Sequence, residues 1–150
     1  MIEIVTADNS RIDDALKIRR EMLAVVNGNS PECYMGEFTE KGRDFFLNGD
    51  QITVLACDGN TAIGCATVCF IRLMPTFSHP TGIRAHLMNV YTRSDYRRQG
   101  IARRMVNELI AAAKCRGATQ ITLDATESGR PLYELLGFTQ SAEHLQLDLY

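Results

Sequence analysis

One short run of residues in the second half of the chain has the composition of an anion-binding turn. It is Arg97-Arg98-Gln99-Gly100-Ile101-Ala102, and Arg103 and Arg104 follow directly. Glycine lets the backbone bend and approach a ligand closely, and alanine adds almost no bulk. The first turn of a helix has unpaired N–H donors and the positive end of the helix dipole, which stabilise an anion placed there. The run therefore predicts a site for a pyrophosphate group.

The segments on either side of this turn are the ones that must hold it in place. Residues 86–92, HLMNVYT, are typical of a strand. After the turn, apolar residues recur at helical spacing on one face, at Ile101, Met105, Val106, Leu109 and Ile110. The sequence predicts a strand that leads through the turn into the N-terminus of an amphipathic helix.

Two motifs in this half of the chain resemble those of the GCN5-related N-acetyltransferase (GNAT) superfamily. The turn matches the family signature R/Q-x-x-G-x-G/A, with Arg97, Gly100 and Ala102 on its three defining positions. The segment LYELLGF at 132–138 is similar to the second family signature, and the strand-like ITLDAT lies between the two. The resemblance implies that the ligand of the turn is acetyl-CoA, a cosubstrate, and that no metal is needed.

The resemblance also implies which residues bind the cofactor. In the family, the strands before the turn and after the long helix splay apart, and the pantetheine arm of coenzyme A lies in the gap. Backbone groups of Val90 and Thr92 would pair with that arm, and Thr126 stands where the family often has an asparagine that contacts it. The turn residues expected at the diphosphate are Arg97, Arg98, Gly100, Ile101, Ala102 and Arg103.

Tyr133 is the candidate proton donor to the coenzyme A thiolate. The family places its acid at this tyrosine of the second signature. A phenol suits the role because its pKa of about 10 is close to that expected of the leaving thiol. The alternative is a packing role, in which the ring covers the junction of helix and sheet as Phe138 does.

His86 is the candidate general base. It lies on the strand before the turn, where the histone-acetylating branch of the family carries a glutamate base. Strand alternation predicts that His86, Met88, Val90 and Thr92 share one face, and histidine can exchange a proton near neutral pH. The alternative is a strand histidine that is only hydrogen-bonded to a neighbour. Glu37 and Glu127 are the remaining candidates for the base.

The acceptor pocket is the least defined part of the sequence. The family resemblance would build it from residues 32–38 and from the loop 75–82. An apolar acceptor could pack against Tyr34, Met35, Phe38 and Phe77. An ammonium group could pair with Glu37, and a carboxylate could be bound by Arg72 and Arg84. The identity of the acceptor stays open.

Length, charge and cysteine usage narrow the class of protein. The chain has 150 residues and a formal net charge of −2, which predicts a single domain over residues 1–150 that does not bind nucleic acid. Its five cysteines are odd in number and form no C-x-x-C pair, so neither disulfides nor a zinc site is expected. Cys65 and Cys69 should share one face of a strand. No leader or membrane-spanning run is recognised, and a cytoplasmic location is expected.

The pattern of elements predicts a mixed α+β fold with a mostly antiparallel sheet flanked by helices. A first helix, started by Asp8 to Ser10, carries Ile12, Leu16, Arg19, Leu23 and Val26 on one stripe. A second helix is expected over 39–47 and a short one over 130–136. Strands are expected at 2–5, 51–57, 62–73, 86–92, 118–125 and 143–150, with a hairpin at Asp58-Gly59-Asn60.

The expected function is transfer of the acetyl group of acetyl-CoA to a primary amine of a small molecule, an amino acid or a peptide. The amine would attack directly in a ternary complex. The alternative is a non-catalytic module of the same fold that binds or senses acyl-CoA, against which the tyrosine at position 133 argues. A homodimer is a further expectation, because Leu145, Leu147 and Leu149 form an apolar stripe that belongs either to the core or to an interface.

Overall fold

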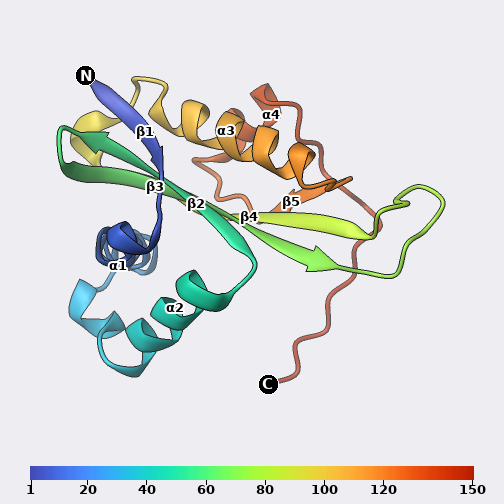
Figure 1. Ribbon diagram of the computed structural model, residues 1–150, viewed down its shortest axis with the longest axis horizontal. Coiled ribbons are helices and arrows are strands. Elements are labelled where there is room, and N and C mark those ends of the chain that lie inside the picture. The colour runs from blue at the N-terminus through green and yellow to red at the C-terminus, as the bar shows by residue number, and fades with distance from the viewer.

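A five-stranded sheet runs through the computed structural model, which describes residues 1–150 (Figure 1). The strands lie side by side in chain order: β1 (Ile2–Thr6), β2 (Gln51–Asp58), β3 (Thr61–Arg72), β4 (Ile83–Thr92) and β5 (Ile121–Leu123). Neighbours from β1 to β4 are antiparallel, and β5 is parallel to β4. The predicted mixed α+β class and mostly antiparallel sheet are confirmed.

Helices cover both faces of the sheet (Figure 1). On one face lie α1 (Ile12–Asn27) and α2 (Glu37–Asn48), and on the other lie α3 (Ile101–Cys115) and α4 (Arg130–Leu135). Short 3₁₀ turns occur at Asn9–Arg11, Pro31–Tyr34 and Ser94–Tyr96. No helix has the length and apolar content needed to cross a lipid bilayer.

Local signals explain the helix boundaries around α1. The Asp8 carboxylate accepts a hydrogen bond from the Ser10 N–H at 2.9 Å, at the start of the helical segment. Gly28 ends α1 in the left-handed region, with φ 68°, and donates to the Ala24 carbonyl. The start at Asp8 to Ser10 was predicted from these residue types and is confirmed, and the glycine explains where the helix ends.

Each face of the sheet has its own buried cluster. Towards α3, Met105, Val106 and Leu109 pack on Val54, Val68 and other small or apolar strand residues. Towards α1, Ala15 and Ile18 pack on the alternate strand positions Leu55, Cys57, Ala62 and Cys65. Burial of each large apolar side chain contributes about 1.5–3 kcal/mol, so these two clusters fix both helices on the sheet.

A β-bulge at Asn89 changes the faces of β4. Between the pairs Cys65–Tyr91 and Thr67–Met88, β4 has one residue more than β3, and Asn89 has φ 58°. Before the bulge Leu87 faces α3, and after it Val90 and Thr92 do. His86 and Met88 therefore face α1, as does Tyr91 beyond the bulge. The prediction that His86, Met88, Val90 and Thr92 share one face is wrong, because simple alternation does not survive an inserted residue.

The C-terminal part departs most from the predicted elements. β5 covers Ile121–Leu123 rather than 118–125, and it pairs with β4 only over Ala85–Leu87. The predicted strand at 143–150 is wrong: these residues form no regular structure and lie at the surface. An alternating pattern becomes a strand only where another strand can pair with it, and within one chain none does.

Candidate functional site

The turn between β4 and α3 leaves a set of backbone donors free. Arg98 and Gly100 adopt left-handed conformations, with φ 62° and 74°. The first backbone hydrogen bond of α3 runs from the Arg104 N–H to the Gly100 carbonyl at 3.1 Å, and no side chain caps the helix. The N–H groups of Ile101, Ala102 and Arg103 have no acceptor in the chain. This is the arrangement that binds phosphate groups at helix N-termini.

The arginines around this turn divide into two pairs. Arg97 donates from Nε to the Thr92 carbonyl at 2.9 Å, and Arg104 donates to the Ile2 carbonyl at 3.0 Å. Arg98 and Arg103 are exposed and make no side-chain hydrogen bond or ion pair within the chain. The first pair fastens the turn to neighbouring strands, and the second remains available to an anion.

One edge of β4 is open next to the turn. Because β5 pairs only with Ala85–Leu87, the following residues 88–92 have no strand beside them on that side. Val90 is half-buried there, and the buried hydroxyl of Thr92 has no hydrogen-bond partner. Thr126, beyond the gap, uses its hydroxyl to accept a hydrogen bond from the Gly129 N–H at 3.1 Å, next to α4. The β4 edge is therefore unpaired over the residues where the resemblance implies that the two strands separate.

Tyr133 lies on α4 with its ring in the core and its hydroxyl free. The ring meets Phe138 edge to face, with 5.8 Å between centroids, and packs against the α3 cluster. The predicted packing role is therefore confirmed. Burial raises the pKa of the Tyr133 phenol, and its hydroxyl makes no hydrogen bond within the chain. A phenol that stays protonated and unpaired is suited to donate a proton.

His86 is held by residues of β5 and the segment after it. Its Nδ1 lies 2.8 Å from the Thr122 hydroxyl, and its Nε2 lies 3.9 Å from an oxygen of the exposed Asp124 carboxylate. The Thr122 contact is the neighbour bond expected under the alternative for this residue, and the role of His86 as a base stays a prediction. Nε2 is still open to a second partner, on the face of the sheet that carries α1.

The structure assembles only some of the expected acceptor residues. Tyr34 and Phe38 contact one another, with ring centroids 5.5 Å apart, where the chain passes from α1 to α2. Glu37 pairs with Lys41 at 3.0 Å, and Arg84 donates to the Gln120 side chain at 2.8 Å. Four others are exposed and make no side-chain hydrogen bond or ion pair within the chain: Met35, Arg72, Phe77 and Glu127.

Arg19, which contacts Phe38, and its hydrogen-bond partner Asn89 were not identified as site residues from the sequence. Arg19 of α1 donates from Nε to the Asn89 side-chain oxygen at 3.4 Å, and its guanidinium lies 5.0 Å from the centre of the Phe38 ring. Burial lowers the pKa of the Arg19 guanidinium. The available signal was the position of Arg19 on the apolar stripe of its helix. For Asn89, the only signal was that asparagine tolerates a positive φ.

Comparison with known proteins assigns the family. Residues 18–138 match the family described as acetyltransferase (GNAT) family. A predicted acetyltransferase from Clostridium acetobutylicum, solved with acetyl-CoA, is 31% identical; the match covers 99% of this chain and 97% of that one, with a TM-score of 0.86. The chain therefore belongs to the GNAT acetyltransferase family.

Two further similarities are more distant. A GCN5-related N-acetyltransferase from Ralstonia eutropha JMP134 has 20% identity and a TM-score of 0.83, with 99% of each chain covered, and it supports the fold alone. A glucosamine 6-phosphate N-acetyltransferase from Trypanosoma brucei brucei is 27% identical over 79 residues, which are 53% of this chain. That match spans only 54% of the curated relative's length.

Proposed function

We propose that this protein is an enzyme that transfers the acetyl group of acetyl-CoA to a primary amine. The observation that carries the proposal is the turn before α3, where the N–H groups of Ile101, Ala102 and Arg103 have no acceptor within the chain and Arg98 is exposed beside them. The presence of acetyl-CoA in the C. acetobutylicum structure supports the same ligand here.

The cofactor is proposed to bind along the open edge of β4. Its diphosphate accepts hydrogen bonds from the amides of the turn, where the helix dipole and the side chains of Arg98 and Arg103 add positive charge. The pantetheine arm pairs with backbone groups of Val90 and Thr92, which have no strand on that side. These contacts direct the thioester towards the bulge at Asn89.

The proposed reaction is a direct attack of the amine on the thioester carbonyl carbon. A C–N bond forms, the C–S bond breaks, and coenzyme A leaves as a thiolate. Tyr133 donates its phenolic proton to that thiolate, and it recovers a proton from solvent afterwards. Burial keeps the phenol protonated at neutral and mildly alkaline pH, so the proton is available, while the raised pKa also makes it a weaker acid than a free phenol.

His86 is proposed to accept the proton that the amine must lose. The Thr122 contact leaves Nε2 as the nitrogen open to a substrate or a water molecule, and Asp124 lies where it can stabilise a positive imidazole. The bulge places His86 on the opposite face of β4 from Val90 and Thr92. The proposed base therefore approaches the amine from the α1 face, which also carries Arg19 and Phe38.

A direct attack is favoured over an acyl-enzyme because the nearby thiols are poor nucleophiles. Burial raises the pKa of the Cys65 thiol to about 12, and this thiol donates to the Asn89 carbonyl at 3.1 Å. Cys69 pairs with His86 across the strands, but burial also raises its pKa, and its sulfur contacts Met88. Thiolate is the reactive form of cysteine, so neither residue is prepared to carry an acetyl group.

Two measurements test the proposal and its alternative, a module that binds acyl-CoA without turnover. Calorimetric titration with CoA should give saturable binding. Release of free thiol from acetyl-CoA should then increase when a suitable primary amine is added from a panel of amines, amino acids and peptides. Binding without amine-dependent thiol release across the panel would favour the binding module, and absence of binding would contradict both.

The C-terminal segment is proposed to form a homodimer contact. Leu145, Leu147 and Leu149 are 99%, 83% and 86% exposed, at alternate positions. β5 lies at the end of the sheet and has a strand on one side only. Residues 143–150 of a second copy could pair along this edge and bury the three leucines, which are unfavourable in water.

A further inference from the structure

Arg19 is a charged residue in a position that the helix pattern reserves for apolar side chains. Its guanidinium lies between α1, α2 and β4, with the Phe38 ring and the Asn89 side chain as neighbours. Gly42 of α2 leaves room for it, since a Cβ at that position would come within 3.3 Å of Arg19 Nη1. The fold therefore makes a space for a guanidinium that is partly buried, while its unpaired Nη atoms are not shut off from solvent.

No carboxylate compensates this charge. Arginines elsewhere form ion pairs with acidic residues, and these are Arg11, Arg43, Arg93, Arg116 and Arg130. Arg19 forms none, and only its Nε donates a hydrogen bond, at the long distance of 3.4 Å. Withdrawing a guanidinium from water is unfavourable unless its donors find partners. Nη1 and Nη2 of Arg19 have no partner within the chain.

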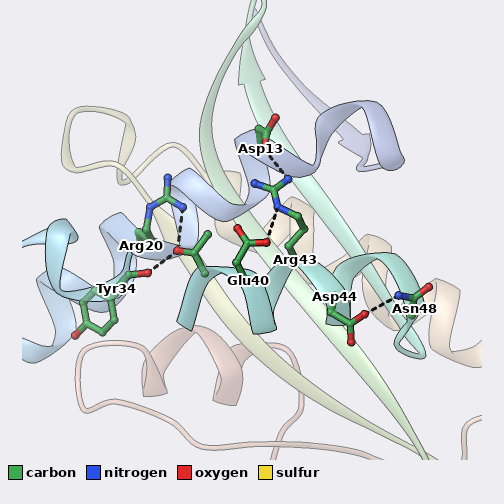
Figure 2. A network of polar contacts seen from close by, with 8 residues as sticks. Asp13, Arg20, Tyr34, Glu40, Arg43, Asp44 and Asn48 are labelled. Carbon is green, nitrogen blue, oxygen red and sulfur yellow. Dashed lines mark hydrogen bonds and ion pairs between the residues drawn. The ribbon is translucent and has the colours of Figure 1, made fainter. Parts of the chain in front are cut away.

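The neighbouring Arg20 shows what a structural arginine does in the same helix. It donates from Nη1 to the Thr39 hydroxyl at 3.4 Å, and Thr39 in turn donates to the Tyr34 carbonyl. Figure 2 shows this chain of contacts beside the pair of Arg43 with Asp13, 2.9 Å apart, which also joins α2 to α1. Arg20 and Arg43 connect the two helices, so Arg19 is not needed for that purpose.

Asn89 links Arg19 to the part of β4 along which the cofactor is proposed to bind. Asn89, its hydrogen-bond partner, is the bulge residue and directly precedes Val90, where the proposed pantetheine arm runs. Given the proposed acetyl transfer, on which this inference rests, we infer that Arg19 selects acceptor amines that also carry an anionic group, a carboxylate or a phosphate. The two free Nη groups bind that anion as a fork, and the amine then extends to the thioester.

Matched pairs of acceptors test this selection without requiring turnover. Each ligand is titrated into protein saturated with CoA: glucosamine 6-phosphate against glucosamine, and L-lysine against L-lysinamide. In the unmodified protein, we expect at least one member that carries the phosphate or carboxylate to bind about tenfold or more tightly than the partner that lacks it, since a charge-assisted hydrogen bond contributes about 1.5–3 kcal/mol. The pair that shows this preference distinguishes phosphate from carboxylate.

Arg19→Gln should abolish the preference and leave the affinity for CoA within twofold. Arg20→Gln is the matched control and should keep the preference. Arg19→Lys should retain part of it, because the charge remains but the fork is lost, and it provides a second variant if the glutamine variant unfolds.

The outcomes separate this inference from the proposed function. The selection by Arg19 is overturned, and acetyl transfer stands, in either of two cases. In the first, CoA binds but neither acceptor with a phosphate or carboxylate is preferred over its partner. In the second, Arg19→Gln weakens the binding of acceptors with and without that group equally. If the unmodified protein does not bind CoA at all, the proposed function fails first, and the acceptor inference fails with it.

Discussion

The turn before α3 and the surface around Arg19 are built in opposite ways. The turn consists of consecutive residues, and its free amides follow from the backbone between Arg98 and Arg103. The Arg19 surface joins α1, α2 and the bulge of β4, and the Arg19–Asn89 hydrogen bond links residues 70 positions apart. A donor site made of contiguous residues can be recognised as a motif, whereas an acceptor site made by tertiary contacts can vary while the motif stays the same.

This difference has a functional consequence. Changes in the turn should affect binding of the acyl donor whatever the acceptor is. Changes around Arg19 should affect the choice of acceptor and leave the donor bound. Tyr133 and His86 belong to neither region and are proposed to move protons, so their variants should affect the chemical step rather than either binding step.

Loss of the Tyr133 hydroxyl should have the largest effect. Tyr133→Phe should lower kcat by about a hundredfold or more, the range for loss of a general acid, with CoA affinity nearly unchanged. Because this hydroxyl makes no hydrogen bond within the chain, the thermal unfolding temperature should not fall. Tyr91→Phe, at another half-buried tyrosine with a pKa raised by burial, is the control and should keep kcat. An unchanged rate in Tyr133→Phe would remove the acid assignment.

Restricting the backbone conformation of the turn before α3 should weaken binding of the acyl donor, CoA. Gly100→Ala places a Cβ on a residue with φ 74°, which costs about 1–2 kcal/mol in the left-handed region, and it narrows the approach to the amides. We expect CoA to bind about tenfold more weakly, measured by calorimetry. Gly59→Ala imposes the same kind of strain at φ 60° in the β2–β3 hairpin, and neither Cβ would contact another atom. Equal losses of CoA affinity in both variants would contradict the role of the turn.

Removal of the His86 imidazole should produce a loss that depends on pH. His86→Gln should lower kcat/KM by about tenfold near pH 7, less than the hundredfold or more usual for an acid–base group. The deficit should shrink as the pH approaches the acceptor pKa of about 10, because more amine is then already neutral. A rate profile from pH 6.5 to 9.5 for both proteins measures this ratio. A deficit that is constant with pH would argue for a positioning role.

The C-terminal segment should control the oligomeric state. Deletion of residues 143–150 should halve the mass measured by light scattering, from dimer to monomer. Leu147→Asp should act in the same direction by adding a charge to the apolar stripe, whereas Gln146→Asp, on the other face of the alternation, should leave the dimer intact. A monomeric full-length chain would exclude the proposed contact.

The smallest expected effect is on the pH dependence of stability, through the buried thiol of Cys65 next to the bulge. The Cys65 thiol has a folded-state pKa of about 12, against about 8.5 for an exposed cysteine. Its contribution to stability is complete below pH 8.5 and is lost as the pH rises towards 12, by up to about 1.4 kcal/mol per pH unit. Urea unfolding at pH 8 and pH 10 should therefore show a steeper loss in the unmodified protein than in Cys65→Ala. Parallel losses would indicate that this thiol does not titrate on unfolding.

Much of the fold was predictable because its signals are local. Asp8 and Gly28 set the ends of the first helical segment, Gly59 and Asn60 set the β2–β3 hairpin, and helical spacing after Gly100 set α3. The predicted strand at 143–150 failed for the same reason, since its alternation is a local signal for pairing and no strand of this chain pairs with it. A local pattern indicates which secondary structure a segment can form. Whether a strand forms depends on a neighbouring strand that can pair with it.

The sequence by itself determined the donor half of the site: the phosphate-binding turn, the tyrosine at position 133 and membership in the class of fold. Tertiary structure alone decided the acceptor half, through the bulge that turns His86 towards α1 and the burial of Arg19 against Phe38 and Asn89. The physical reason is the range of the interactions. Amides at a helix N-terminus are left unpaired by the geometry of one turn, whereas burial of a charge and the face of a strand depend on residues that are distant in the chain.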